Sequence, residues 1–147
     1  MHTRQATLKD ISQLQEIRNA VTENVLSDPG LISTADYAFF LTRKGSGWVY
    51  ENEGAILGFG IVDLQDNNVW ALFVRPGFEN KGIGRELHQK MMNWYFSNTQ
   101  QMVWLSTAPG TRAASFYMAA GWQQNGIYGK GELRFEMTYE QWLMTQG

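Results

Sequence analysis

The chain has 147 residues, of which 44% are hydrophobic and 18% are charged, and its formal net charge at pH 7 is −2. This length and composition are typical of one globular domain, so we expect residues 1–147 to fold as a single unit. The chain contains no cysteine, which excludes disulfide bonds, cysteine-ligated zinc and a thiol nucleophile. No stretch approaches the roughly 18 apolar residues of a membrane span, and the net charge attracts no polyanion. We therefore expect a cytoplasmic protein that binds neither membranes nor nucleic acid.

The N-terminal third predicts one short strand and two helices. Residues 3–6 form the candidate strand, and Thr7 with Asp10 makes a capping-box-like pair at the start of a helix. That helix carries an apolar face at helical spacing, formed by Leu8, Ile11, Leu14, Ile17 and Val21. Ser33 is the expected N-cap of the second helix, and residues 23–32 form the loop between the two helices.

The middle of the chain changes to strand patterns. Three apolar runs separated by turn residues predict an antiparallel meander over residues 47–50, 55–64 and 69–74. Residues 75–81 interrupt the third strand. Apolar residues at helical spacing then predict a long amphipathic helix that runs to Phe96.

The C-terminal part predicts two more strands and one helix. The strands occupy residues 102–106 and 132–137, the helix occupies residues 111–120, and Thr138 caps a terminal turn. The whole order predicts an α+β (mixed α/β) fold with a mixed sheet. Its one clear strand-helix-strand crossover, residues 69–106, is where we expect the ligand site.

The turn before the long helix has the features of an anion-binding loop. Gly82 and Gly84 stand where a strand ends and a helix begins, so backbone N–H groups without helical partners converge there. A helix N-terminus attracts negative charge, and glycine lets a ligand approach the backbone closely. Arg75, Lys81 and Arg85 would add positive charge, and pyrophosphate is the natural guest. The alternative is a plain turn that starts a helix.

Two other phosphate-binding loops fit poorly. A Walker A loop requires Gly-Lys followed by Ser or Thr, whereas Lys81 precedes Gly82 here and neither hydroxyl residue is near. A Rossmann loop requires a third glycine at the position of Leu87 and an early parallel strand, whereas this loop follows a meander. Gly58-Phe59-Gly60 lies within a strand and is not a loop motif.

Two motifs resemble those of the GCN5-related N-acetyltransferase (GNAT) family. Glu79 to Gly84 resembles its coenzyme-binding signature (Gln/Arg)-x-x-Gly-x-(Gly/Ala), with Glu79 in place of Gln or Arg. Ala113 to Trp122 is similar to its Ala-x-x-Phe-Tyr-x-x-x-Gly-Phe element, although the Asn often found just before it is absent around Gly110. The element order resembles the family over essentially the whole chain.

The resemblance implies a single-domain GNAT-like fold. Its central sheet would be mostly antiparallel, with a strand-helix-strand coenzyme-binding crossover and helices on both faces. It also implies acetyl-CoA as acetyl donor, no metal, and direct transfer to a primary amine of a small molecule or an exposed protein amine. The alternative is a catalytically weak or inactive coenzyme A-binding sensor or scaffold. A homodimer is common among similar proteins.

The resemblance also implies roles for individual residues. Tyr117 would protonate the departing thiolate, and a backbone N–H of Leu72 or Phe73 would stabilise the oxyanion. Core packing is the alternative role for Tyr117. The residues expected to contact the coenzyme are Leu72, Phe73, Val74, Glu79, Asn80, Lys81, Gly82, Ile83, Gly84, Arg85, Arg112 and Phe116.

The acceptor site is less defined by sequence. Glu23 is the favoured general base, ahead of Asp63, because the loop after the first helix borders the acceptor site in similar proteins. A solvated helix end is the alternative for Glu23. The expected substrate-binding residues are Asn24, Tyr37, Trp70 and Tyr128, and such an aromatic and acidic cleft would suit a cationic or amphipathic amine. His2 and His88 lack metal-ligand spacing and are interpreted as surface residues.

Overall fold

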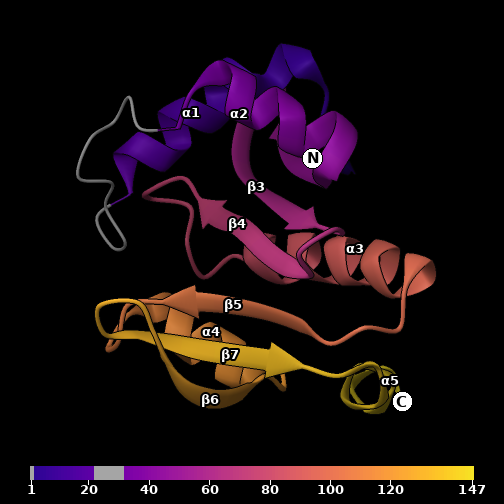
Figure 1. The fold of residues 1–147 in the computed structure, drawn as a ribbon. Helices are drawn as coiled ribbons and strands as arrows, with labels where there is room; N and C mark the ends of the chain where they lie inside the picture. The colour runs from indigo at the N-terminus through magenta and orange to yellow at the C-terminus, as the bar shows by residue number, and fades with distance from the viewer. Residues whose placement is uncertain (1, 22–31) are drawn as a thin grey trace.

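The computed structural model describes residues 2–21 and 32–147, within which seven strands form one sheet in the order β1-β2-β3-β4-β5-β7-β6 (Figure 1). The strands are β1 (His2–Gln5), β2 (Gly45–Asn52), β3 (Ala55–Asp63), β4 (Asn68–Val74), β5 (Val103–Thr107), β6 (Gln123–Tyr128) and β7 (Glu132–Met137). The helices are α1 (Ile11–Ala20), α2 (Thr34–Phe39), α3 (Ile83–Asn98), α4 (Arg112–Ala119) and α5 (Tyr139–Gln146). A 3-10 turn η1 (Leu8–Asp10) precedes α1, and a π-helical turn η2 (Phe40–Lys44) follows α2.

The predicted fold class is confirmed. The sheet is antiparallel except where β4 and β5 pair in parallel, and α3 connects these two strands. The capping box expected at Thr7–Asp10 is present, and Ser33, the expected N-cap of the second helix, forms a capping box with Asp36. None of the described helices is long and apolar enough to cross a membrane.

Two elements near the C-terminus differ from the prediction. Strand β6 was not predicted, because all six of its residues are exposed and it carries no apolar alternation. Helix α5 extends to eight residues where only a capped turn was expected. Trp142 of α5 is buried and stacks against Phe96 of α3, so packing stabilises the extra turn of helix.

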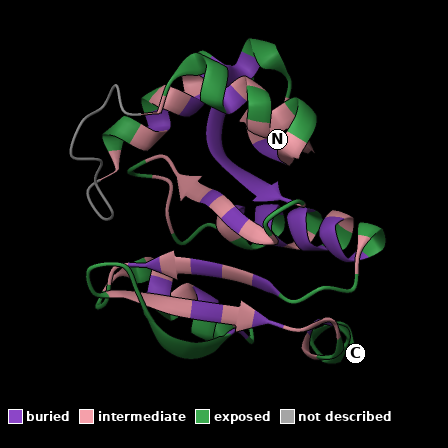
Figure 2. Cartoon of the chain, in the orientation of Figure 1, coloured by how far each residue is buried: buried purple, intermediate pink, exposed green. Residues whose placement is uncertain are grey.

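Helices cover both faces of the sheet. Helices α1 and α2 pack on one face over the buried residues Phe59 and Ile61, whereas α3, α4 and α5 pack on the other face. Figure 2 shows β3 buried along almost its whole length between these layers. A Cβ at Gly58 would lie 3.0 Å from Ile83, and one at Gly60 would lie 3.2 Å from Met91. The Gly58-Phe59-Gly60 sequence therefore lets α3 approach the sheet closely.

The prediction that His88 lies on the surface is wrong. Its side chain is 5% exposed, packs between α3, α4 and α5, and accepts a hydrogen bond at Nε2 from the indole N–H of Trp122 at 3.0 Å. Burial lowers the pKa of His88 to about 4, so the imidazole is neutral at pH 7. The spacing Ile83, Leu87, Met91 places His88 beside the apolar stripe of α3, which sequence reasoning overlooked.

The buried imidazole predicts a loss of folding stability in mild acid. Below the unfolded-state pKa of about 6.5, the unfolded chain binds a proton that the folded chain excludes until its pKa of about 4. Stability is therefore fully present above pH 6.5 and falls as the pH drops towards 4. We expect this histidine to lower the free energy of unfolding by about 2 kcal/mol between pH 7 and pH 5, because each pH unit between the two pKa values costs about 1.36 kcal/mol.

Urea unfolding of wild type and His88→Gln at the two pH values measures this loss. The glutamine retains an acceptor for the Trp122 N–H but does not titrate. Equal losses in both proteins would show that His88 does not contribute to acid sensitivity.

The one parallel pairing opens into a splay between β4 and β5. The described backbone pairs these strands only at Asn68 and Trp104, and the N–H of Trp104 donates to the carbonyl of Asn67 at 2.9 Å. Beyond this point the strands separate. Figure 1 shows β3 and β4 with α1 and α2 on one side of the splay, and β5, β7 and β6 with α4 and α5 on the other.

Candidate active site

The turn that enters α3 has the predicted anion-binding geometry. Gly82 is the N-cap of α3 and has φ of +82°, in the left-handed region that glycine adopts without strain. No side chain caps this end, so N–H groups of the first turn point outwards without a helical partner. The sixteen-residue helix adds a positive partial charge at the same place.

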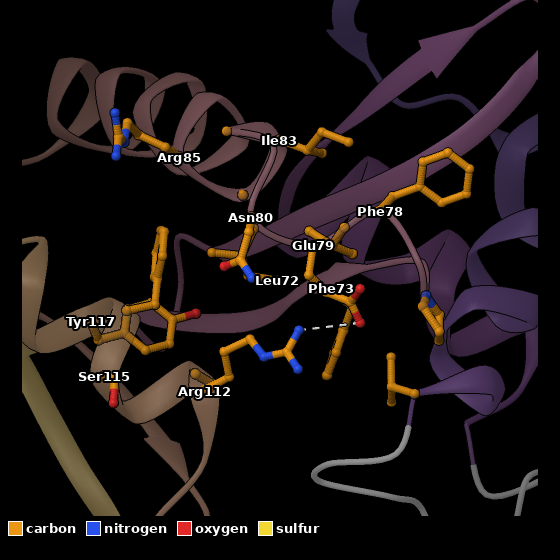
Figure 3. A pocket seen from close by; sticks show the side chains of 17 residues that line it. Leu72, Phe73, Phe78, Glu79, Asn80, Ile83, Arg85, Arg112, Ser115 and Tyr117 are labelled. Carbon is orange, nitrogen blue, oxygen red and sulfur yellow. Dashed lines mark ion pairs between the residues drawn. The ribbon is translucent and has the colours of Figure 1, made fainter.

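A cavity of about 570 Å³, here called the α3 cavity, opens in front of this helix end. The α3 N-terminus, the end of β4 and the start of α4 form its walls (Figure 3). The predicted coenzyme-contact residues that line it are Leu72, Phe73, Val74, Glu79, Asn80, Gly82, Ile83, Gly84, Arg85, Arg112 and Phe116. Lys81 is not among the lining residues, and its ammonium lies 5.9 Å from the centroid of the Phe78 ring.

The expected positive cluster is arranged differently. Arg75 does not line the α3 cavity, because its guanidinium donates to Glu16 at 2.7 Å and to the carbonyl of Ile56 at 3.1 Å. This side chain ties β4 to α1 and β3. The arginines that line the cavity are Arg85 and Arg112.

Glu79, the departure from the family signature, is paired with a cation. Its carboxylate lies 3.3 Å from the guanidinium of Arg112 and accepts the N–H of Gly77 at 2.8 Å (Figure 3). Its own backbone N–H, the Gly77 N–H and the charge of Arg112 lower the pKa of Glu79 below its ordinary value. The ion pair crosses the α3 cavity from the loop to α4, and it reduces the repulsion that Glu79 would exert on a pyrophosphate.

Glu79→Gln is expected to tighten acetyl-CoA binding about two- to fivefold, from the loss of one nearby negative charge and the release of Arg112. The amide oxygen can still accept the Gly77 N–H. Isothermal titration calorimetry measures the change. Glu86→Gln is the matched control, since Glu86 is exposed on the first turn of α3 and does not line the cavity. Weaker binding by Glu79→Gln alone would show instead that the ion pair positions Arg112 for the ligand.

Tyr117 of α4 is both a core residue and a cavity residue. Its ring packs against Trp122 and Phe135, and the residue is only 5% exposed. Figure 3 shows its hydroxyl pointing into the α3 cavity. Burial raises the pKa of Tyr117 above its usual value, so the phenol keeps its proton at neutral pH.

A second cavity of about 230 Å³, here called the splay cavity, lies between the separated strands. It shares Leu72, Phe73, Ala113 and Tyr117 with the α3 cavity. The two cavities therefore meet at the end of β4, beside the Tyr117 side chain.

Two of the predicted substrate residues, Tyr37 and Trp70, line the splay cavity. Trp70 is the extra residue of a β-bulge, because Ala71 pairs with Ile61 while Val69 pairs with Val62. Its ring stacks on Phe40 at 3.9 Å, which fixes it as one wall of the cavity. Glu23 and Asn24 lie outside the described residues.

Tyr128, also predicted to bind substrate, is placed differently from Tyr37 and Trp70. Tyr128 lies on β6, is 46% exposed and contacts Trp104, and it lines neither cavity. The sequence analysis did not predict β6, which places this residue on the outer edge strand of the sheet. Asp63 is also structural: it is buried and pairs with Lys44 at 3.0 Å.

Sequence reasoning missed Arg18 of α1 and Glu132 of β7, both of which line the splay cavity. Glu132 accepts a hydrogen bond from the hydroxyl of Ser106 at 2.9 Å. Both residues occupy ordinary polar positions of amphipathic elements, so no local signal distinguished them. Among the described residues, no group of three or more His, Asp or Glu side chains is arranged to hold a metal ion.

Solved structures of N-acetyltransferases share this fold. PaiA N-acetyltransferase from Thermoplasma acidophilum, in complex with coenzyme A, is 15% identical, with 94% of this chain and 98% of that chain covered and a TM-score of 0.81. The ribosomal-protein-alanine N-acetyltransferase from Brucella melitensis is 19% identical, with 94% and 99% covered and a TM-score of 0.76. A phosphinothricin acetyltransferase from Sinorhizobium meliloti, in complex with AcCoA, is 16% identical, with 93% and 87% covered and a TM-score of 0.76.

Sequence comparison agrees with the fold. No curated protein sequence matches the chain at a significant level. The profile of the acetyltransferase (GNAT) family, however, matches residues 11–122, which is most of the chain and includes both motifs. The chain belongs to the acetyltransferase (GNAT) family.

Proposed function

We propose that the protein is an acetyl-CoA-dependent N-acetyltransferase that transfers the acetyl group directly to a primary amine of a small molecule or an exposed protein amine. The observation that carries this proposal is the junction of the α3 cavity with the splay cavity at Leu72, Phe73 and Tyr117. A donor in one cavity and an acceptor in the other would meet there. Such a junction supports transfer within one ternary complex, without an acyl-enzyme.

The α3 cavity fits a coenzyme with a pyrophosphate and an extended arm. The uncapped N-terminus of α3 suits the pyrophosphate. A Cβ on Gly84 would lie 3.7 Å from both Phe116 and Val74, so glycine leaves open the space between these two cavity residues. The open edge of β4 offers backbone groups to the arm. Acetyl-CoA would supply the thioester acetyl group at the junction.

Leu72 is the better of the two predicted oxyanion donors. The N–H of Arg75 donates to the carbonyl of Leu57 in β3 at 2.7 Å. Because N–H directions alternate along an antiparallel strand, the N–H of Phe73 also faces β3, whereas those of Leu72 and Val74 face the splay. We therefore propose that the Leu72 N–H stabilises the charge that develops on the acetyl oxygen.

Tyr117 is the proposed proton donor. As the amine nitrogen bonds to the acetyl carbon, the carbon–sulfur bond breaks and the sulfur takes up the hydroxyl proton of Tyr117. The nitrogen loses one proton as the amide forms, and that proton restores the phenol. Burial raises the pKa of the phenol, which makes it a weaker acid. The same burial raises the proton affinity of a thiolate beside it, so proton transfer from the phenol to the sulfur stays favourable.

The amine must be neutral before it attacks, and two carboxylates are candidates for accepting its proton. Glu23 remains the proposal from sequence and lies outside the described residues. Glu132 lines the splay cavity with Tyr117 and is held by Ser106. A carboxylate at this position would also attract the ammonium form of the acceptor.

A thiol-release assay across a panel of amines tests the function. We expect coenzyme A to be released only when acetyl-CoA and an acceptor amine are both present, with the acetylated amine detected by mass spectrometry. Binding of acetyl-CoA with no release across the panel would favour the alternative, a coenzyme-binding sensor or scaffold.

A further inference from the structure

The guanidinium group of Arg18, from α1, packs on Phe73, a residue that lines both cavities. The side chain lines the splay cavity, and its guanidinium carbon lies 4.4 Å from the centroid of the Phe73 ring. Phe73 is one of the residues shared by both cavities. A positive charge therefore lies beside the junction of the two cavities.

This arginine has no counter-charge among the described residues. Its Nη1 atom is buried and makes no hydrogen bond within residues 2–21 and 32–147. Four other arginines form ion pairs: Arg4 with Asp10, Arg75 with Glu16, Arg112 with Glu79 and Arg134 with Glu136. Arg43 and Arg85 form none with the described residues, but both are exposed to water. Burial without an anionic partner lowers the pKa of Arg18, yet a guanidinium keeps its proton in proteins.

Holding such a group in the fold is unfavourable. A buried polar group without a hydrogen-bond partner lowers stability, and the cation–π contact with Phe73 offsets only part of that loss. Methionine could fill the same space at a lower cost. The unpaired Nη1 of Arg18 is thus suited to donate to an anionic group that arrives with a ligand.

We propose that the acceptor carries a carboxylate as well as its amine, and that Arg18 binds this carboxylate. This inference rests on the proposed acetyltransferase function and replaces the cationic amine expected from sequence. Arg18 comes from α1 on one side of the splay and Glu132 from β7 on the other, so the cavity offers a cation to the carboxylate and an anion to the ammonium. Its volume of about 230 Å³ lies below the usual range for ligand pockets, which favours a small amino acid.

Paired acceptors test the proposal. Thiol release is measured with amino acids of different length as acceptors. Each amino acid is compared with its carboxamide, which lacks the negative charge, and polyamines are measured as well. We expect wild type to prefer at least one acid over its carboxamide by roughly tenfold to a hundredfold in kcat/KM, the effect of a charge-assisted hydrogen bond. Arg18→Met should lose most of that ratio, chiefly through KM, while acetyl-CoA binding stays unchanged.

The control is Arg43→Met, which removes the same charge at an exposed position on η2 outside both cavities. A second readout does not depend on activity. Arg18→Met should melt about 3 °C higher than wild type, because a half-buried guanidinium with a buried, unpaired Nη1 is gone. A lower melting temperature would mean that Arg18 has a structural partner, and would overturn the proposal.

The outcomes separate this inference from the proposed function. No acetyl-CoA binding would reject both. Transfer to carboxamides or polyamines as efficiently as to acids, or an unchanged acid preference in Arg18→Met, would reject the carboxylate site and leave the acetyltransferase. Acetyl-CoA binding without transfer to any amino acid of the panel would also overturn the proposed carboxylate site.

Discussion

Gly82→Glu is expected to abolish acetyl-CoA binding while leaving a folded protein. Gly82 has φ of +82°, and a Cβ placed there would meet no other atom within 4 Å, so the cost to folding is backbone strain of about 1 kcal/mol. The new carboxylate, however, would stand at the uncapped N-terminus of α3. It would repel a pyrophosphate by about 4 kcal/mol at a separation of about 4 Å and an effective dielectric of 20, roughly a thousandfold in Kd.

Gly129→Glu is the matched control for this variant. Gly129 also has positive φ, +60°, and open space around it, but it lies in the turn between β6 and β7 and lines neither cavity. Both variants should lose similar stability in urea unfolding, and only Gly82→Glu should lose binding in calorimetry. Wild-type affinity in Gly82→Glu would place the pyrophosphate elsewhere.

Tyr117→Phe is expected to reduce kcat about 100- to 1000-fold, the usual contribution of a positioned general acid, with acetyl-CoA affinity unchanged. No described residue exchanges a hydrogen bond with the Tyr117 hydroxyl, so its removal should leave the folding stability close to that of wild type. The phenylalanine ring retains the packing on Trp122 and Phe135.

Single-turnover thiol release separates chemistry from product release in this variant. Tyr139→Phe provides the control, because it removes a hydroxyl from a partly buried tyrosine that packs on Phe96, outside both cavities. Unchanged turnover in Tyr117→Phe would remove the phenol from catalysis and leave it a packing residue.

Local sequence signals predicted the loop and helix start that border the α3 cavity. The strand end, the two glycines and the helix start lie within fifteen residues, and each is a local backbone preference. The ion pair of Glu79 with Arg112 could not be predicted in this way, because Arg112 comes from α4 and the approach of α4 to the loop is a property of the tertiary fold. The same holds for Arg75, whose partner Glu16 lies on α1.

The acceptor side depends on tertiary structure to a greater extent. Arg18 and Glu132 come from opposite ends of the chain and become neighbours of one cavity only because β4 and β5 separate. Tyr128 lies on β6, which was not predicted because it is an exposed edge strand without an apolar pattern. His88 was misplaced because a lone histidine beside an apolar stripe does not reveal in sequence whether it faces water or a third helix.

Titration of the full chain with acetyl-CoA by isothermal titration calorimetry is the most direct test of the central claim, a coenzyme cavity at the N-terminus of α3. We expect saturable binding of one acetyl-CoA per chain with a Kd in the micromolar range, and competition by coenzyme A. No saturable heat at millimolar acetyl-CoA would contradict the assignment of this cavity and, with it, the proposed acetyl transfer.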